Sequence, residues 1–187
     1  MLAFWQSLLF IALAEMGDKT QLVALAFATR FSARVVLTAI FVATLLVHLL
    51  SVAIGEALGL MIPTFWLTLA AGVAFIGFGV WTLRGDTLDD DEISKTRRFG
   101  PFLTVALAFF VAELGDKTML ATVTLASQLH SALPVWLGST VGMVIADGLA
   151  VIIGLLAGRR LPVRAIKYGS AGVFIVSGLL TLGSLVV

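Results

Sequence analysis

Long apolar stretches alternate with short polar breaks along the whole chain. A helix that crosses a lipid bilayer needs about 20 consecutive, mostly apolar residues, and six stretches of the sequence meet that requirement. They cover residues 2–28, 35–59, 63–83, 101–127, 132–157 and 163–186. A proline lies near the start of four of them, where its missing N–H costs a helix little: Pro63, Pro101, Pro134 and Pro162. The pattern predicts an all-α integral membrane protein with six transmembrane helices.

The composition supports a membrane location and narrows the expected partners. Hydrophobic residues make up 60% of the chain and charged residues 12%, whereas a soluble domain averages about 25% charged residues. The net charge is only +1 and the basic residues form no patch, so the expected partner is the lipid bilayer and not a nucleic acid. The chain has no cysteine, which excludes disulfides, thiolate metal ligands and cysteine nucleophiles.

The distribution of Lys and Arg predicts how the helices are oriented. Apart from one lysine in each of two repeated hexapeptides, every Lys and Arg lies in or beside the breaks after the first, third and fifth stretches. The other breaks and both termini carry none. Since cytoplasmic loops carry an excess of basic residues, we expect both termini outside and three cytoplasmic loops, including residues 84–100.

The second half of the chain repeats the first. The hexapeptides at residues 15–20 (EMGDKT) and 113–118 (ELGDKT) differ at one position and lie 98 residues apart. We therefore predict a three-helix repeat over residues 1–83, a cytoplasmic loop with acidic and basic residues over 84–100, and a second three-helix repeat over 101–187. Because each repeat has an odd number of spans, the second enters the membrane from the opposite side. Many secondary transporters have such inverted repeats, with the site at the midplane between them.

The hexapeptides place ionisable groups inside apolar stretches. A charged side chain at the bilayer centre costs at least about 2.5–3.5 kcal/mol, and such residues usually serve a function. If each hexapeptide is helical, its Glu and Asp share one face, and the two faces can meet at the midplane. We expect four carboxylates to bind a divalent cation there: Glu15, Asp18, Glu113 and Asp116. Neutral oxygen ligands are expected from Thr20, Gln21 and Thr118.

The oxygen ligands restrict the choice of cation. Ca²⁺, Mn²⁺ and Mg²⁺ suit such a site, although Mg²⁺ ranks third because it gives up its water reluctantly. Zn²⁺ and Cu⁺ are disfavoured because they prefer nitrogen and sulfur ligands. The residues leave Mn²⁺ and Ca²⁺ as open alternatives, and either is expected as cargo and not as a resident cofactor. When the cation leaves, the crowded carboxylates are expected to take up protons, which predicts cation–proton exchange.

Four further residues are candidates for supporting roles. Lys19 and Lys117 can each form an ion pair within their own helix, four residues after a glutamate, or bridge to carboxylates of the other half and lock a gate. Asp147 lies in the middle of an apolar stretch and is expected to act as a ligand or proton carrier. His48 occupies the matching place in the first half, at a spacing of 99 residues. It is either a proton-path residue or a neutral, hydrogen-bonded core histidine.

Three other interpretations compete with a cation transporter. The hexapeptides can form a purely structural ion-pair cluster, although two copies at matching depth weaken that interpretation. Asp18 and Asp116 can form the dyad of an intramembrane aspartyl protease, but a glutamate replaces the first glycine that such enzymes present. An exporter of organic cations or amino acids would need fewer clustered acids and a larger polar cavity. The sequence therefore favours a transporter and not an enzyme.

The doubled E-x-G-D-K-T motif in a six-span chain resembles uncharacterised protein family 0016, a group of calcium/manganese cation–proton antiporters. The resemblance covers the whole chain and implies export of Mn²⁺, Ca²⁺ or both from the cytoplasm in exchange for protons. The acids of the family motif correspond to Glu15, Asp18, Glu113 and Asp116, and its basic and hydroxyl positions correspond to Lys19, Thr20, Lys117 and Thr118. Because the chain lacks the targeting extension expected of organellar members, we expect a bacterial plasma membrane.

Overall fold

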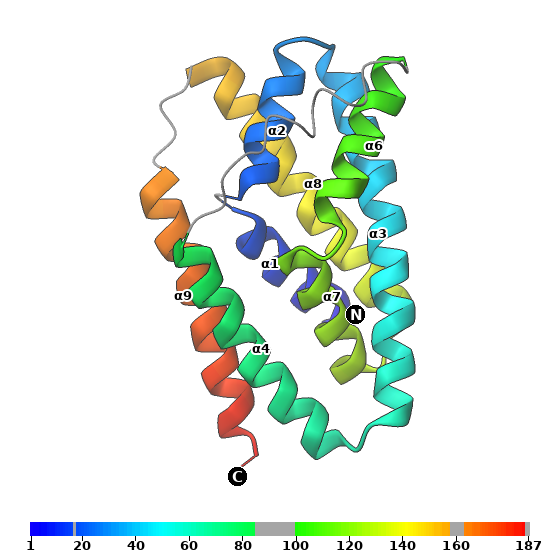
Figure 1. Ribbon diagram of the computed structural model, residues 1–187, viewed down its shortest axis with the longest axis vertical. Helices are drawn as coiled ribbons and strands as arrows, with labels where there is room; N and C mark the ends of the chain where they lie inside the picture. Colours follow the sequence, from blue (N-terminus) through cyan, green and yellow to red (C-terminus); the bar gives the residue numbers. More distant parts are fainter. Residues whose placement is uncertain (17, 85–99, 158–162, 186–187) are drawn as a thin grey trace.

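The structure is a computed structural model that describes residues 1–16, 18–84, 100–157 and 163–185 (Figure 1). Every regular element in these ranges is an α-helix. The helices are α1 (Leu2–Glu15), α2 (Lys19–Ala28), α3 (Ala33–Met61), α4 (Thr64–Arg84), α6 (Pro101–Glu113), α7 (Lys117–Leu129), α8 (Ala132–Ala157) and α9 (Val163–Gly183). The all-α prediction is thus confirmed for these residues. Apart from Arg84 and Gly100, the predicted cytoplasmic loop lies outside them.

Four predicted stretches appear as single helices, and two are broken. The first stretch divides into α1 and α2, and the fourth divides into α6 and α7, each time inside a hexapeptide. The prediction that each hexapeptide is helical was therefore wrong. Asp18 and Asp116 have extended backbone and act as N-caps of the following helices, a position that aspartate favours. In the second break Gly115 also has a positive φ of 79°, which glycine adopts without steric cost.

Only three helices of the described chain are individually long and apolar enough to cross a membrane. They are Ala33–Met61, Thr64–Trp81 and Ala132–Ile153. Shorter apolar helices cover Leu2–Glu15, Pro101–Glu113 and Phe174–Gly183. Because α1 and α6 end at the hexapeptides, each needs its following helix, α2 or α7, to complete a span of the predicted length. The number of six crossings remains a prediction.

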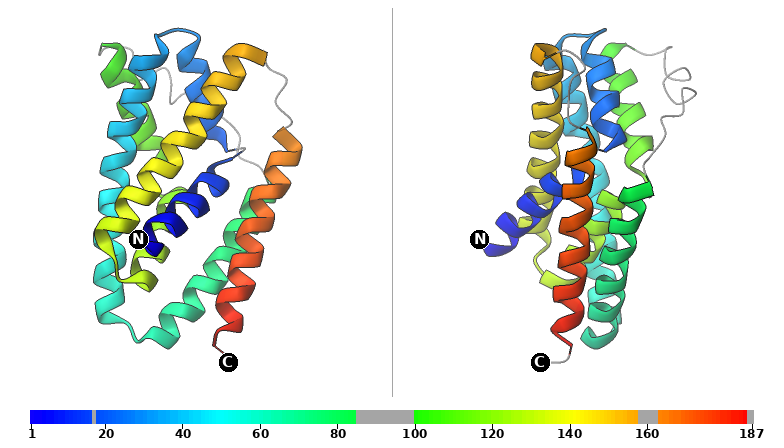
Figure 2. Two further views of the ribbon diagram at one scale, coloured as in Figure 1. Left: turned by 180° about the vertical axis from the view of Figure 1, so that it is seen from behind. Right: turned by 90° about the vertical axis from the view of Figure 1, so that its left-hand side faces the viewer.

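The packing of the helices is reciprocal between the halves. The broken segment α1–α2 packs against α8, the broken segment α6–α7 packs against α3, and α4 packs along α9. In Figure 1 the α1–α2 segment rises, whereas the α6–α7 segment descends. The left view of Figure 2 shows the α4–α9 pair at one side of the other helices, and the right view shows α9 in front of them. Each hexapeptide is therefore held by a long helix of the opposite half.

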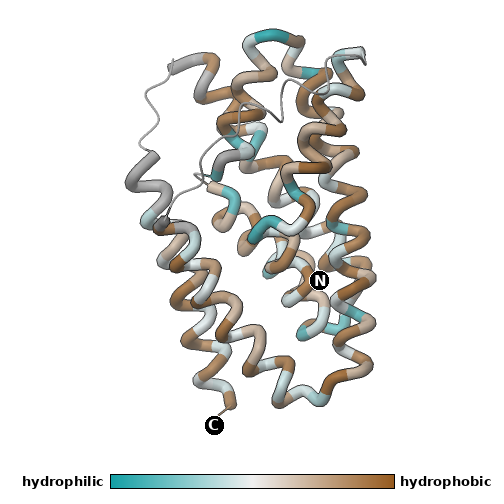
Figure 3. The backbone as a smooth tube through the Cα atoms, viewed as in Figure 1, coloured by the Kyte–Doolittle hydropathy of each residue, from teal (hydrophilic) through white to brown (hydrophobic). Residues whose placement is uncertain are grey.

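Two buried apolar clusters enclose the hexapeptides. One cluster joins α1, α4, α7, α8 and α9 around Phe75 and Phe174, and the other joins α2, α3, α6 and α8 around Phe27 and Phe109. Hydrophilic segments of the backbone lie at mid-height, at the two helix breaks (Figure 3). Burial of apolar surface above and below thus isolates a polar layer inside the helix bundle.

Glycines on α8 set the close contact with α1. A Cβ atom on Gly142 would lie 2.4 Å from the carbonyl oxygen of Leu8, and one on Gly138 would lie 2.3 Å from that of Phe4. Small residues allow such close helix contacts in membranes. We expect Gly142→Ala to destabilise the protein by about 1–3 kcal/mol, because the backbone must move to relieve the clash.

The thermal unfolding of purified protein in detergent, followed by tryptophan fluorescence, measures this effect. Gly172→Ala in α9 is the matched control, because no atom lies within 4 Å of its added Cβ. Alanine improves helix propensity by up to about 1 kcal/mol, so this control should melt at or slightly above the wild-type temperature. Equal melting of the Gly142 variant and the control would show that the α1–α8 contact tolerates a methyl group.

Candidate functional site

The two helix breaks have the same backbone geometry. Asp18 has φ −76° and ψ 163°, and Asp116 has φ −75° and ψ 168°. The N–H of each aspartate donates to the carbonyl of the glutamate three residues earlier, at 3.0 Å for Asp18 and 3.2 Å for Asp116. Each hexapeptide therefore places a glutamate at the end of one helix and an aspartate at the start of the next. The repeat in sequence is also a repeat in local structure.

The breaks also orient four helix ends toward the polar layer. The C-terminal ends of α1 and α6 leave backbone carbonyls without partners in their own helices, and such half-helix ends can coordinate cations in transporters. The N-terminal ends of α2 and α7 carry partial positive charge, which stabilises the carboxylates of Asp18 and Asp116. A continuous helix would provide neither group of partial charges. The observed breaks thus suit an ionic site better than the helical hexapeptides that we expected.

The structure brings together the four predicted motif carboxylates. Glu15 and Glu113 are 0% exposed, and both aspartates are buried. The carboxylate of Glu15 lies within range of electrostatic repulsion from Glu113 and Asp18. The carboxylate of Glu113 is repelled in the same way by Asp116 and Asp18. The acids of the two halves therefore form one buried cluster.

Threonine hydroxyls hold the two glutamates in equivalent ways. Thr118 Oγ1 donates to Glu113 Oε2 at 2.8 Å, and Thr20 Oγ1 donates to Glu15 Oε1. Among the residues that the structure describes, Glu15 Oε2 and Glu113 Oε1 accept no hydrogen bond. One oxygen of each glutamate is thus positioned by a threonine, and the other is available to a cation or a proton. Thr20 and Thr118 orient the glutamates and are less suited to the ligand role that we expected.

An ion pair joins the two halves across the cluster. Lys117 Nζ donates to Asp18 Oδ1, and both side chains are buried. Lys117 also experiences the charges of Glu15 and Asp116. Of the two alternatives for this lysine, the structure shows the bridge to the other half, and its role in a gate stays a prediction. The side chain of Lys19 lies outside the described residues.

Asp147 joins the carboxylate cluster, whereas no described hydrogen bond links His48 to it. Asp147 lies in α8, is fully buried, and influences both Glu15 and Glu113 electrostatically. Neither of its carboxylate oxygens has a hydrogen-bond partner among the described residues. His48 is equally buried in α3, and neither of its two ring nitrogens has a hydrogen-bond partner among the described residues. The hydrogen-bonded core histidine that we considered is therefore not observed.

Gln21 and Met143 lie in contacts that the sequence interpretation missed. Gln21 Nε2 donates to the carbonyl oxygen of Ala146 at 3.0 Å, so this amide fixes α2 to α8 next to Asp147. Met143, one helical turn before Asp147, accepts a hydrogen bond from Thr44 Oγ1 at 3.5 Å. Thr44 and Met143 have the same spacing of 99 residues as His48 and Asp147. This shared spacing was the signal that could have identified the contact.

The cluster is not yet arranged as a metal coordination shell. Within the described residues, no group of three or more His, Asp or Glu side chains has a geometry ready to hold a metal ion. The ammonium group of Lys117 lies against Asp18, where a cation would otherwise bind. The donor set nevertheless consists of carboxylate oxygens, which suit Ca²⁺ and Mn²⁺.

Comparison with known proteins agrees with this chemistry. The sequence model of a family described as "Divalent cation/proton antiporter GDT1" matches residues 3–90 and 101–186. A protein of Vibrio cholerae named "Putative manganese exporter" is 39% identical over 177 residues, which cover 94% of this chain and 88% of the relative. "GDT1-like protein 5" of Arabidopsis thaliana is 26% identical over 96% of this chain and 94% of its own length. A GDT1-like protein of Synechocystis is 28% identical over 84% and 83%. No solved structure shows detectable similarity.

Proposed function

Because the chain belongs to the GDT1 divalent cation/proton antiporter family, we propose that it exports Mn²⁺ from the cytoplasm in exchange for protons. The family assignment confirms the resemblance carried by the doubled hexapeptide, and it identifies a membrane transporter and not an enzyme. The observation that supports the proposal most strongly is the buried carboxylate cluster at the two equivalent helix breaks. Mn²⁺ is preferred to Ca²⁺ because a relative with 39% identity is named a manganese exporter. Ca²⁺ remains the second candidate.

The cation site is proposed at Glu15, Asp18, Glu113 and Asp116. The oxygens without partners, Glu15 Oε2 and Glu113 Oε1, offer one ligand from each half. Asp147 is an additional candidate ligand, because its carboxylate is buried and repels both glutamates electrostatically. His48 receives no ligand role, because neither of its ring nitrogens forms a hydrogen bond with any described residue of the cluster.

Proton exchange follows from the electrostatic repulsion among the carboxylates when no cation is bound. Several carboxylates in one buried, low-dielectric region repel one another strongly, and a divalent cation removes that repulsion. When the cation leaves, protons on the same oxygens can remove it instead. Cation and protons therefore compete for one set of atoms, which couples their movements in opposite directions.

Lys117 is proposed to stabilise the cation-free transporter. Its ammonium group provides a tethered positive charge next to Asp18, so the cation must displace it before Asp18 can become a ligand. Lys19 has the equivalent position in the other hexapeptide. We propose that Lys19 bridges to the opposite half in the alternative conformation, so that each lysine closes one of the two gates.

Residues 1–83 and 101–187 are proposed to form inverted repeats on either side of loop 84–100. Three observations support this arrangement: the equal geometry of the two breaks, the reciprocal packing of each broken segment on the opposite half, and the opposite directions of these segments in Figure 1. The distribution of the basic residues supports the proposal that both termini lie outside. Alternating access then requires rearrangement around a site at the midplane.

Purified protein reconstituted into liposomes provides the test of this function. A gradient of Mn²⁺ should drive protons into the compartment that Mn²⁺ leaves, and an imposed pH gradient should drive Mn²⁺ in the opposite direction. Because the ligands are oxygens, transport should be fastest for Mn²⁺ and Ca²⁺ and weak for Mg²⁺ and Zn²⁺. Fluorescent reporters of cation and pH measure both fluxes, with protein-free liposomes as control. Mn²⁺ flux that ignores the pH gradient would identify a channel or uniporter instead.

A further inference from the structure

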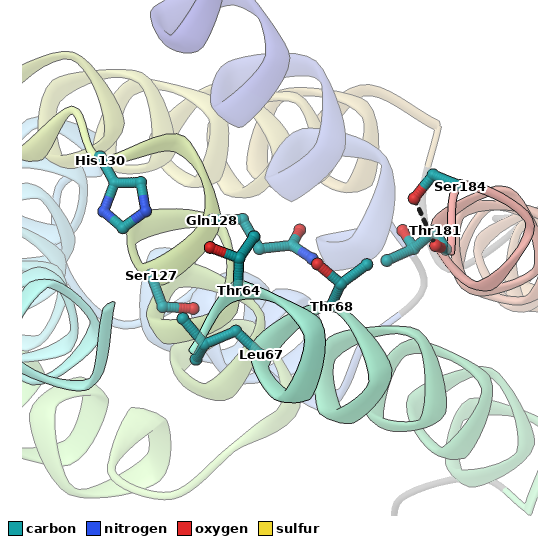
Figure 4. A pocket seen from close by; sticks show the side chains of 8 residues that line it. All are labelled: Thr64, Leu67, Thr68, Ser127, Gln128, His130, Thr181 and Ser184. Atoms are coloured by element: carbon teal, nitrogen blue, oxygen red, sulfur yellow. Dashed lines mark hydrogen bonds between the residues drawn. The ribbon is translucent and has the colours of Figure 1, made fainter. Parts of the chain in front are cut away.

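A polar cavity of about 240 Å³ lies between the ends of three helices, far from the carboxylate cluster. Figure 4 shows that side chains from α4, α7 and α9 converge on it. Its lining includes the amide of Gln128, the imidazole of His130 and five hydroxyl groups, those of Thr64, Thr68, Ser127, Thr181 and Ser184. The turn between α2 and α3, one of the three breaks that carry basic residues, is at the opposite end of the helix bundle (Figure 1). The cavity is therefore on the side that we assign to the outside.

The lining is polar but carries no acidic side chain. Two of its hydroxyls donate to their own helices, Ser127 Oγ to Thr124 O at 2.8 Å and Ser184 Oγ to Thr181 O at 2.7 Å. Their oxygens can still accept hydrogen bonds from water. Neutral oxygen donors can accommodate the water shell of a divalent cation, but without carboxylates they lack the charge that gives high affinity. Such a lining therefore suits a path for a hydrated cation and not a tight binding site.

A second hollow of about 410 Å³ adjoins the first and is a groove open at the surface, because Leu9, Leu13 and Leu180 in its lining are exposed. The cavity and the groove share Gln128 and Thr181 as lining residues. The groove extends along α1 and is also lined by Phe10, Phe75 and Leu125. The open space thus runs from the helix ends to the apolar core below the hexapeptides.

Aromatic side chains of α1, α4 and α9 pack together where the groove meets the buried core. The ring centroid of Phe10 lies 4.9 Å from that of Phe75 and 5.4 Å from that of Phe174. Phe75 and Phe174 belong to the same buried cluster as Ala14, the residue next to Glu15. Hydrophobic constrictions of this kind exclude water and act as gates in ion pathways. We call Phe10, Phe75 and Phe174 the aromatic plug.

We propose that the polar cavity, with the end of the groove that shares Gln128 and Thr181, forms the outer vestibule of the transporter, through which hydrated Mn²⁺ leaves and protons enter, and that the aromatic plug closes it from the carboxylates. This inference rests on the proposed exchange of Mn²⁺ for protons. It adds the outer half of the path and its gate. The described structure then has its outer gate closed while water can reach the vestibule.

Cysteine labelling tests the vestibule, because the chain has no cysteine of its own. Gln128→Cys and Thr181→Cys place a thiol on the shared lining of the cavity and the groove. A positively charged thiosulfonate reagent that does not cross membranes, added from outside to reconstituted protein, should modify both variants. Modification should cause loss of most Mn²⁺/proton exchange, since it adds a fixed positive charge to the cation path.

Two control positions define the side and the specificity of labelling. Val176→Cys lies in α9 on an apolar residue that is 55% exposed, so it should face lipid, resist the charged reagent and keep its transport rate. Ser94→Cys, in the predicted cytoplasmic loop, should react only from the other side of the membrane.

The outcomes separate the vestibule from the function. If the wild type exchanges Mn²⁺ for protons but neither vestibule cysteine reacts from outside, the vestibule is wrong and the function stands. Full modification of both cysteines without loss of exchange would also contradict the vestibule and leave the function standing. If the wild type carries no Mn²⁺, the proposed function fails and the vestibule fails with it.

Discussion

Glu15→Gln and Glu113→Gln should each abolish Mn²⁺-driven proton movement in reconstituted vesicles. Glutamine keeps the size of the side chain and the oxygen that accepts from the threonine, but it removes the negative charge and a cation ligand. Changes in the second shell of metal sites already cost 10–100-fold, so loss of a ligand should reduce transport by at least about 100-fold. Transport rates of the two variants and of the wild type at equal amounts of protein measure the effect.

The same variants should remain folded, which separates a defect in the site from a defect in stability. Each substitution removes one charge from a crowded buried cluster, so the melting temperature without Mn²⁺ should not fall. In the wild type, Mn²⁺ at 100 times its Kd should stabilise the fold by about 2.7 kcal/mol, and this stabilisation should be absent in both variants.

Glu56→Gln is the matched control for these substitutions. Glu56 lies in α3 and is not among the groups that influence Glu15 or Glu113 significantly. Its glutamine variant should transport at the wild-type rate and retain stabilisation by Mn²⁺. Wild-type transport in both Glu15→Gln and Glu113→Gln would reject the carboxylate site.

Lys117→Gln should cause the second large effect, on stability as well as on transport. The substitution leaves the carboxylate of Asp18 buried without its ammonium partner. Removal of one partner from a buried ion pair typically costs about 3–5 kcal/mol. We therefore expect a clearly lower melting temperature in the absence of Mn²⁺, together with loss of exchange.

A double-mutant cycle shows whether the pair itself is responsible. Asp18→Asn combined with Lys117→Gln should recover part of the lost stability, with a coupling of about 0.5–3 kcal/mol, while exchange should remain absent because a ligand is missing. Lys117→Arg keeps the charge and should be milder than Lys117→Gln. Lys19→Gln provides the comparison at the equivalent position of the first hexapeptide. Normal melting of Lys117→Gln would show that the ion pair does not stabilise the resting transporter.

Much of this architecture could be predicted from local sequence. Stretches of about 20 apolar residues are long enough for one bilayer crossing, and α3, α4, α8 and α9 agree with four of the predicted stretches to within a few residues. The doubled hexapeptide identified the family and all four motif acids of the buried cluster. These features could be predicted because hydrophobicity, helix length and a repeated motif depend on neighbouring residues.

The helix breaks were within reach of the sequence but were not predicted. Each hexapeptide combines a glycine with an aspartate, and these residues favour turns and N-caps over helix interiors. The long apolar runs on both sides nevertheless suggested continuous helices. A break that exposes backbone polar groups inside an apolar region is acceptable only where protein or water can satisfy them, and that condition depends on the surrounding helices.

The partners inside the site came from three-dimensional packing alone. Sequence spacing could not decide whether Lys117 pairs with Glu113 or with an acid of the other half, and it treated His48 and Asp147 as equivalents. The packing of α1 and α2 against α8 brings Asp147 to the glutamates, whereas the ring nitrogens of His48 in α3 form no hydrogen bond with any described residue. Contacts between residues about 100 positions apart depend on how whole helices pack. A one-dimensional pattern can therefore show which charges are buried, but not which of them meet.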